Sequence, residues 1–234
     1  IGVRLVGSEM CIRDRHITNG AVFEDVGQWK RPWYFPINKD ETMDEAVQRE
    51  SKNVRENAGV LDGSTLGKIE IKGKDALAFM NLIYTNSFSK MKPGTSRYAL
   101  MLGEDGMVKD DGIICKISDE HFIATTTTGG AATVLGCMEE YAQTEWPNLN
   151  VYMNSITEQY ATFNISGPKT RNIIEKVFPE VNFSNEAFPF MTFQFHEYED
   201  TPIRILRASF TGEMGYEIYV CLLYTSPSPR DGLL

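Results

Sequence analysis

Alternating and helically spaced apolar residues divide this chain into short strands and amphipathic helices. Residues 66–73 (LGKIEIKG) alternate apolar and polar side chains, a pattern that predicts a strand, and residues 74–86 predict an amphipathic helix. Residues 41–60 carry apolar residues at helical spacing, with Gly59 as a stop signal. The predicted buried face of this helix consists of Met43, Ala46, Val47, Val54 and Ala58.

The middle of the chain continues the same alternation of strands and helices. Residues 97–130 predict three strands joined by turns at GEDG and SDEH. Residues 131–146 (AATVLGCMEEYAQTEW) predict a helix that ends before Pro147. Three more strands are predicted at residues 190–198, 202–210 and 215–220.

Two segments of the chain repeat one strand–glycine–helix pattern. Residues 66–84 align with residues 160–178. The equivalent pairs are Ile71 with Ile165, Gly73 with Gly167, and Asp75 with Lys169. This repeat predicts an α+β fold of two similar strand–helix–strand lobes.

The two ends of the chain do not follow this pattern of strands and helices. GSEMCIRD (residues 7–14) and CLLYTSPS (residues 221–228) can be encoded by complementary strands of one oligonucleotide, which looks like a transposon-end adaptor from sequencing libraries. We therefore expect residues 1–15 and roughly 221–234 to be translated adaptor. The alternative is a basic N-terminal tail and a proline-rich linker.

The remaining sequence divides into an arm and a domain. Residues 16–40, rich in Trp, Pro and Gly, predict an extended aromatic arm that packs onto a neighbouring surface. Residues 41–220 predict one domain, and we expect it to be incomplete at its C-terminal end. The hydrophobic content of 42% is enough for a real core.

Charge and cysteine usage narrow the class of partners. The net charge is −9 at pH 7 and the chain has no basic run, which argues against nucleic acid and anionic membranes. No apolar stretch is long enough to span a bilayer. Outside the expected adaptor, Cys115 and Cys137 read as reduced core residues, which predicts a cytoplasmic protein. The three histidines are scattered singly, so no metal site is predicted.

Two acidic residues at the start of a predicted strand are the first candidates for chemistry. Asp110 and Asp111 are adjacent, so their side chains should point to opposite faces of the sheet. An inward carboxylate must be hydrogen-bonded structurally or held for a ligand. The alternative is a turn acid that caps backbone amides.

The segment RASFTGEMGYEIYV (residues 207–220) is the second candidate. Thr211 and Gly212 predict a tight turn that places Glu213 at its edge, and Tyr216 and Glu217 should fall on opposite faces. A carboxylate at such a turn suits recognition of a flat edge with amide and amine groups, such as a pterin. The alternative is an ordinary hairpin with an exposed glutamate.

Four ordered blocks carry a resemblance to a known family. They are GVLDGSTLGKIEIKGKDA, YALMLGEDGMVKDDG, ISGPKTR and RASFTGEMGYEIYV, and together they resemble the folate-binding fold of the glycine-cleavage aminomethyltransferase family. GAVFEDVGQWKRPWYFP and AQTEWP look most like the alpha subunits of heterotetrameric sarcosine oxidases, in their C-terminal region. The glycine-cleavage branch tends to carry Ser-His where this chain has Ser64-Thr65.

The resemblance implies a function and a set of site residues. It implies that the fold binds tetrahydrofolate and captures the one-carbon unit of sarcosine, as an imine or formaldehyde, to give methylenetetrahydrofolate. It implies a catalytic role for Asp110 or Asp111 and a pterin-binding role for Glu213. It implies that the aromatic ring of Tyr98 packs against the folate as a wall of its site, and Glu217 and Tyr216 are further folate-binding candidates.

The resemblance also implies what lies outside this stretch. Flavin and NAD are expected only in regions beyond this sequence or in partner subunits of the oxidase. A further, C-terminal lobe is expected downstream of this sequence. The isolated fragment is therefore expected to be inactive. Two alternatives stay open: an aminomethyltransferase or dimethylglycine-dehydrogenase-type fusion, and a folate-binding scaffold without turnover.

Overall fold

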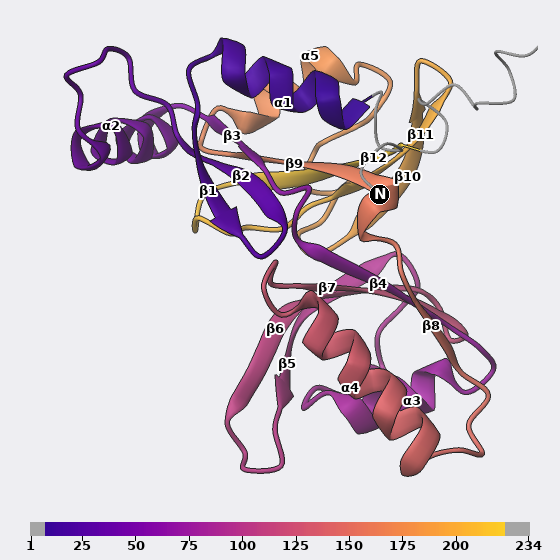
Figure 1. Cartoon of the computed structure of the whole chain (residues 1–234). Coiled ribbons are helices and arrows are strands. Elements are labelled where there is room, and N and C mark those ends of the chain that lie inside the picture. The colour runs from indigo at the N-terminus through magenta and orange to yellow at the C-terminus, as the bar shows by residue number, and fades with distance from the viewer. Residues whose placement is uncertain (1–7, 223–234) are drawn as a thin grey trace, which may run out of the picture. The chain divides into compact units, whose positions relative to one another are not determined.

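The computed structural model describes residues 8–222, and the side chains from residue 12 onward (Figure 1). The chain forms two compact units. Within the described residues, unit 1 holds residues 8–64, 159–190 and 195–222. Unit 2 holds residues 65–158 and 191–194. Both contain helices and antiparallel strands, so the predicted α+β class is confirmed.

Unit 2 is a five-stranded antiparallel sheet with helices on one face. Its strand order is β5-β6-β7-β4-β8. Its elements are β4 (Gly67–Lys72), α3 (Ala76–Ile83), β5 (Thr95–Leu102), β6 (Val108–Ser118), β7 (His121–Thr126), α4 (Ala131–Thr144) and β8 (Tyr152–Ser155). Phe79 of α3 and Met138 of α4 join Ile69, Ile71 and Phe122 of the sheet in one core. Cys115 and Cys137 are buried, as predicted for core residues.

Unit 1 contains a second five-stranded sheet in the order β10-β11-β12-β9-β3. Its elements are α1 (Ser8–Thr18), β1 (Val22–Val26), β2 (Trp29–Tyr34), α2 (Met43–Glu56), β3 (Gly59–Asp62), β9 (Tyr160–Ser166), α5 (Thr170–Val177), β10 (Phe193–Tyr198), β11 (Thr201–Leu206) and β12 (Gly215–Cys221). A short 3-10 helix, η1 (Thr157–Gln159), precedes β9. Ile174 of α5 packs in a core with Ile165, Ile205 and Ile218 of the sheet.

The strand–glycine–helix repeat has the same backbone geometry in both units. Gly73 follows β4 with φ +137°, and Gly167 follows β9 with φ +134°. The Asp75 amide donates to the Asn150 carbonyl (3.2 Å), and the Lys169 amide donates to the Asn57 carbonyl (2.9 Å). The two sheets also have matching strand orders, with β4 and β9 at equivalent places.

The predicted extended arm is instead a helix end followed by a hairpin. Helix α1 ends at Thr18, and β1 and β2 pair as a two-stranded antiparallel sheet. Arg31 donates to Glu24 (2.7 Å) and Lys30 to Asp25 (2.6 Å) across the pair. The segment therefore folds back at Gly27, and charged cross-strand pairs join its two strands. Composition alone had predicted an extended arm.

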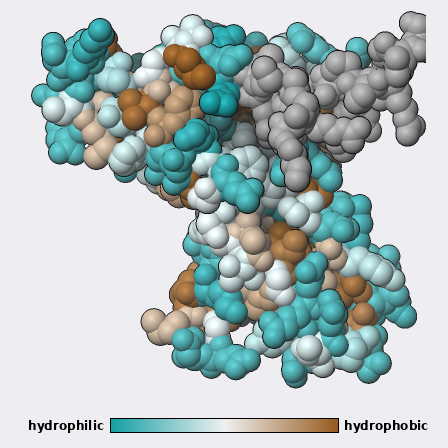
Figure 2. Space-filling model, in the orientation of Figure 1, coloured by the Kyte–Doolittle hydropathy of each residue, from teal (hydrophilic) through white to brown (hydrophobic). Residues whose placement is uncertain are grey.

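Helix α2 exposes part of the face that was predicted to be buried. Ala46 is buried, but Met43 and Val47 are exposed. The visible side of α2 is largely hydrophilic in Figure 2. A capping box stabilises its start, because Thr42 accepts from the Glu45 amide while the Glu45 side chain accepts from the Thr42 amide. Helical spacing thus predicted the helix correctly, but not how much of it is covered.

The expected adaptor segments fall only partly in the described region. Residues 8–15 belong to α1, Cys221 ends β12, and residues 1–7 and 223–234 lie outside the described residues. Their origin stays a prediction. Among the described residues, no helix is both long and apolar enough to cross a bilayer.

Candidate functional site

The adjacent aspartates of β6 point to opposite faces of the unit 2 sheet. Asp110 is 7% exposed, whereas Asp111 is exposed. The Thr127 amide donates to Asp110 Oδ2 (3.2 Å). The inward aspartate is therefore Asp110, and it holds the backbone between β7 and α4.

Asp111 shares its face with the predicted aromatic wall. In the β5–β6 register Leu100 lies opposite Asp111, and Tyr98 lies opposite Ile113. Directly opposed residues share a face, and so do residues two apart along a strand. Tyr98 and Leu100 are 47% and 43% exposed. The structure therefore brings Tyr98, Leu100 and Asp111 together on one accessible face and places Asp110 on the other.

Tyr84 is a buried neighbour of Asp110 that the sequence did not single out. Its ring packs edge-on against Phe88, with ring centroids 6.1 Å apart. Burial, and secondly the negative charge of Asp110, raise the pKa of Tyr84 well above its ordinary value of 10.0. In the folded chain Tyr84 therefore stays protonated at a pH where the unfolded chain would ionise it.

This shift predicts a loss of stability in alkali. Below about pH 10 the contribution of Tyr84 is fully present, and above it the free energy of unfolding should fall by up to about 1.4 kcal/mol per pH unit. Tyr84→Phe should flatten this decline. Urea unfolding at about pH 9 and about pH 11 measures it. Tyr152→Phe, which changes an exposed tyrosine of β8, is the control and should leave the decline unchanged.

Glu213 is held by an ion pair within unit 1. Arg55 of α2 donates through Nη1 to Glu213 Oε1 (2.8 Å) and to the Thr211 carbonyl (2.9 Å). The predicted turn is present, with Gly212 at φ +82° and the Glu213 amide donating to Thr211 Oγ1 (3.4 Å). This arrangement ties the turn to α2, and the pterin-binding role of Glu213 stays a prediction.

Glu217 and Tyr216 lie on opposite faces of β12, as their alternation requires. Glu217 is buried and accepts a hydrogen bond from the Tyr219 hydroxyl (2.5 Å). Tyr216 is fully buried, and its ring stands edge-on to Phe183 and Phe188. Tyr216 therefore contributes its ring to the unit 1 core, and its proposed contact with folate stays untested.

Two further residues of unit 1 were missed by sequence reasoning. Arg204 of β11 is 2% exposed, with its guanidinium over the Tyr219 ring (4.1 Å). Phe210, on the bend before Glu213, is 79% exposed. The available signals were a cation inside the apolar run PIRILRASF and an aromatic residue next to a turn.

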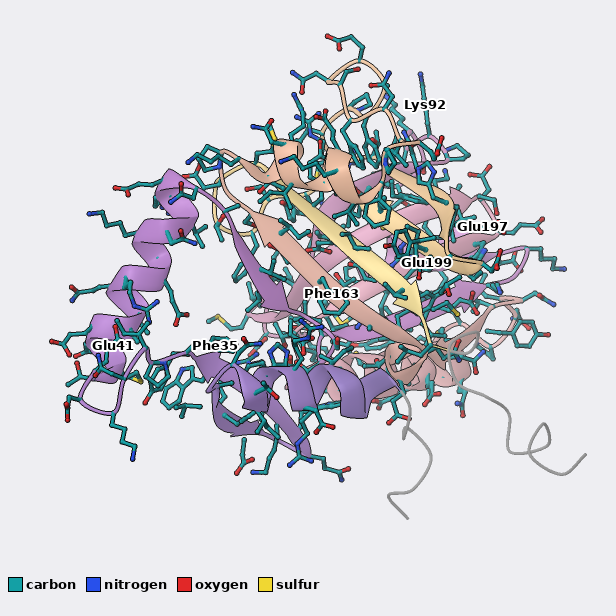
Figure 3. All side chains as sticks on the ribbon, turned by 90° about the horizontal axis from the view of Figure 1, so that it is seen from above. Phe35, Glu41, Lys92, Phe163, Glu197 and Glu199 are labelled. Atoms are coloured by element: carbon teal, nitrogen blue, oxygen red, sulfur yellow. The ribbon has the colours of Figure 1, made fainter. Side chains whose placement is uncertain are left out.

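Two pockets within unit 1 contain none of the predicted site residues. One, of about 910 Å³, has Phe35, Asp62 and Phe163 among its lining residues. A second, of about 420 Å³, has Phe163, Phe178 and Glu199 among its own. Figure 3 labels Phe35 ahead of α2 and Phe163 on β9. The predicted residues thus lie on sheet faces and a turn, outside both pockets.

Comparison with known proteins places these features in a family. The model of the GCVT N-terminal domain family matches residues 12–224. Sarcosine oxidase subunit alpha of Corynebacterium sp. (strain U-96) is 52% identical over 206 residues, which cover 88% of this chain and 21% of that subunit. The aminomethyltransferase of Thermotoga neapolitana is 27% identical over 205 residues, covering 88% of this chain and 52% of that enzyme.

A solved structure agrees with the fold. The crystal structure of glycine cleavage system aminomethyltransferase T from Bartonella henselae matches with a TM-score of 0.73 at 22% identity, covering 91% of this chain and 53% of that one. The present chain spans about a fifth of the sarcosine oxidase subunit and about half of the aminomethyltransferases. Because the family model matches nearly the whole sequence, the chain belongs to the GCVT N-terminal domain family.

Proposed function

We propose that this chain is the tetrahydrofolate-binding part of a sarcosine oxidase alpha subunit. Identity to such a subunit is 52%, against 27% to the aminomethyltransferase, and this difference favours the oxidase over a free-standing aminomethyltransferase. The fragment would capture the one-carbon unit of sarcosine, delivered as an imine or formaldehyde. Flavin chemistry would reside elsewhere in the oxidase, in other regions or partner subunits.

The accessible face of β5 and β6 is the observation that carries this proposal. Tyr98 and Leu100 offer apolar surface beside the carboxylate of Asp111 on one face. A flat heterocycle with amine nitrogens needs both kinds of group, an apolar wall and a proton acceptor. Asp110 is buried and already accepts from Thr127, so we assign the chemical role to Asp111.

Glu217 is the best candidate in unit 1 for the polar edge of a pterin. An ionised carboxylate has about four acceptor sites, and Glu217 accepts one hydrogen bond among the described residues. Its burial would strengthen each hydrogen bond that it accepts. Glu213 is the competing candidate, although Arg55 already neutralises its charge.

A separate role follows from the residue type of each candidate, Asp111 in unit 2 and Glu217 in unit 1. Two amine nitrogens of tetrahydrofolate would bond to the one-carbon unit and lose their protons, while the oxygen of formaldehyde leaves as water or the nitrogen of the imine leaves in glycine. The Asp111 carboxylate would take the proton that such a nitrogen loses, a role worth about 10²–10⁴-fold in rate. Glu217 would orient the ligand by accepting from its N–H groups. Neither role requires a metal ligand from this chain.

Titration of tetrahydrofolate into variants of the 234-residue chain tests the binding proposal. Glu217→Gln should raise Kd about 10–100-fold, because a hydrogen bond to a charged group contributes about 1.5–3 kcal/mol. Glu213→Gln should change Kd by less than about threefold. Calorimetry measures both, with circular dichroism to check the fold. Failure of the unaltered chain to bind tetrahydrofolate would refute the proposal, and a loss confined to Glu213→Gln would overturn the assignment of Glu217.

A further inference from the structure

A buried arginine in unit 1 lacks a counterion among the described residues. Arg204 lies on β11 and is 2% exposed. Its guanidinium carbon lies 4.1 Å from the centroid of the Tyr219 ring and 6.0 Å from that of Tyr160. Aromatic faces attract a cation but accept few of its hydrogen bonds. Within residues 8–222 the charge is therefore covered by aromatic rings and is not neutralised by a carboxylate.

The orphaned donors of Arg204 form one edge of the guanidinium. Nε and Nη2 are both buried, and neither has a hydrogen-bond partner in the described part of the chain. Their N–H groups point the same way in the plane of the group, as two parallel donors. This edge fits the two oxygens of a carboxylate in a bidentate pair.

The nearby acid does not fill this role. Glu217 lies on the same face, since the register pairs Arg204 with Tyr219 and Glu217 is two residues from Tyr219. Glu217 instead accepts from the Tyr219 hydroxyl, while Arg204 stacks on the Tyr219 ring. No carboxylate of the described residues pairs with Arg204 at ion-pair distance. An uncompensated buried charge normally costs several kcal/mol, so an anionic ligand that bound Arg204 would stabilise this site.

A second orphaned group lies on this face. Thr162 of β9 is opposite Tyr219 in the β9–β12 register, so it faces the same side as Arg204. Its Oγ1 is buried and has no hydrogen-bond partner among the described residues. Two strands of one sheet therefore present unpaired polar atoms on one side, beside the Glu217–Tyr219 hydrogen bond.

We propose that Arg204 binds the carboxylate of a small-molecule ligand through its Nε–Nη2 edge. A single cation with a planar pair of donors matches a singly charged planar anion better than a phosphate, which needs more donors. Two sources fit this chemistry: the carboxylate of an N-methyl amino acid, and the glutamyl carboxylate of a folate, whose pterin could not then reach Glu217 beside Arg204 because the benzoyl group separates the two ends. The inference does not rest on folate binding, because either source would satisfy Arg204.

Equilibrium binding to variants of the 234-residue chain tests this inference. The variants are Arg204→Met, which removes the charge, and Arg204→Lys, which keeps the charge but loses the paired donors. Arg31→Met is the matched control, since Arg31 pairs with Glu24 on the hairpin. The ligands are acetate, acetamide and inorganic phosphate at constant ionic strength, N-methylglycine and its amide, and tetrahydrofolate and a tetrahydropterin without the benzoylglutamate. Shifts in melting temperature and calorimetry give the affinities.

The expected result is weaker carboxylate binding in both Arg204 variants. Acetate should stabilise the unaltered chain more than acetamide does, and the affinity for the carboxylate ligand should fall about tenfold or more in Arg204→Lys. Arg31→Met should behave like the unaltered chain. If Arg204→Met does not fold, Arg204→Lys and the comparison of acetate with acetamide still test whether Arg204 binds a carboxylate.

The two sources leave different patterns. If Arg204→Lys binds tetrahydrofolate more weakly but binds the tetrahydropterin as the unaltered chain does, the folate carboxylate is the ligand group. If Arg204→Lys loses affinity for N-methylglycine and not for its amide, the amino-acid carboxylate is the ligand group. This result would stand even if tetrahydrofolate did not bind. Equal affinities in the unaltered chain and Arg204→Lys would overturn the inference, as would phosphate stabilising the chain as strongly as any carboxylate.

Discussion

Asp111→Asn is expected to slow one-carbon transfer to tetrahydrofolate by about 10²–10⁴-fold, the usual contribution of a positioned acid or base. An amide has nearly the shape of a carboxylate but cannot accept a proton from an amine nitrogen. Since Asp111 is exposed on its strand, the substitution should leave the fold intact. The measurement is the rate of methylenetetrahydrofolate formation by a sarcosine oxidase whose alpha subunit carries this sequence in place of its own matching region.

Asp110 provides the matched control one residue away. Asp110→Ala would remove the acceptor of the Thr127 amide, a partly buried hydrogen bond, at a cost of about 0.5–1.5 kcal/mol in the free energy of unfolding. The folded fraction of that variant should retain its transfer rate. The opposite pattern, with full activity in Asp111→Asn and none in a folded Asp110→Ala, would reverse the assignment.

Most strands and helices could be predicted from the sequence because alternation and helical spacing are local patterns. Alternation and helical spacing predicted β4 to β7, α3 and α4 of unit 2, and the repeat predicted the equivalent turns at Gly73 and Gly167. The hairpin of β1 and β2 was missed because cross-strand ion pairs stabilise it, and composition does not reveal which residues pair. The exposure of Val47 was missed because spacing shows which residues share a face and not what covers that face.

The candidate site depended on contacts between residues far apart in the sequence. Alternation predicted that one of Asp110 and Asp111 points inward, but choosing between them required the register of β5 against β6 and the amide of Thr127. The Glu213–Arg55 ion pair joins residues 158 apart, which no local pattern indicates. Arg204 was passed over because an arginine in a strand is usually at the surface.

The largest expected effects on stability come from the two repeated glycines. A Cβ at Gly73 would lie 2.1 Å from the Asn150 carbonyl oxygen, and one at Gly167 would lie 2.5 Å from the Asn57 carbonyl oxygen. Backbone atoms cannot move aside as a flexible side chain can, and both glycines have φ values that L residues rarely adopt. Gly73→Ala and Gly167→Ala should each lower the free energy of unfolding by about 3 kcal/mol or more.

Gly136 offers a control for the same chemical change. It lies inside α4, and a Cβ there would have no atom within 4 Å. Gly136→Ala should raise the free energy of unfolding by about 1 kcal/mol, because alanine favours the helix and has less freedom in the unfolded chain. Urea unfolding followed by circular dichroism measures all three variants. Since folded domains are stable by only about 5–15 kcal/mol, Gly73→Ala and Gly167→Ala should show clearly lowered midpoints. If both matched Gly136→Ala, the close backbone approach that defines the repeat would not exist in the folded protein.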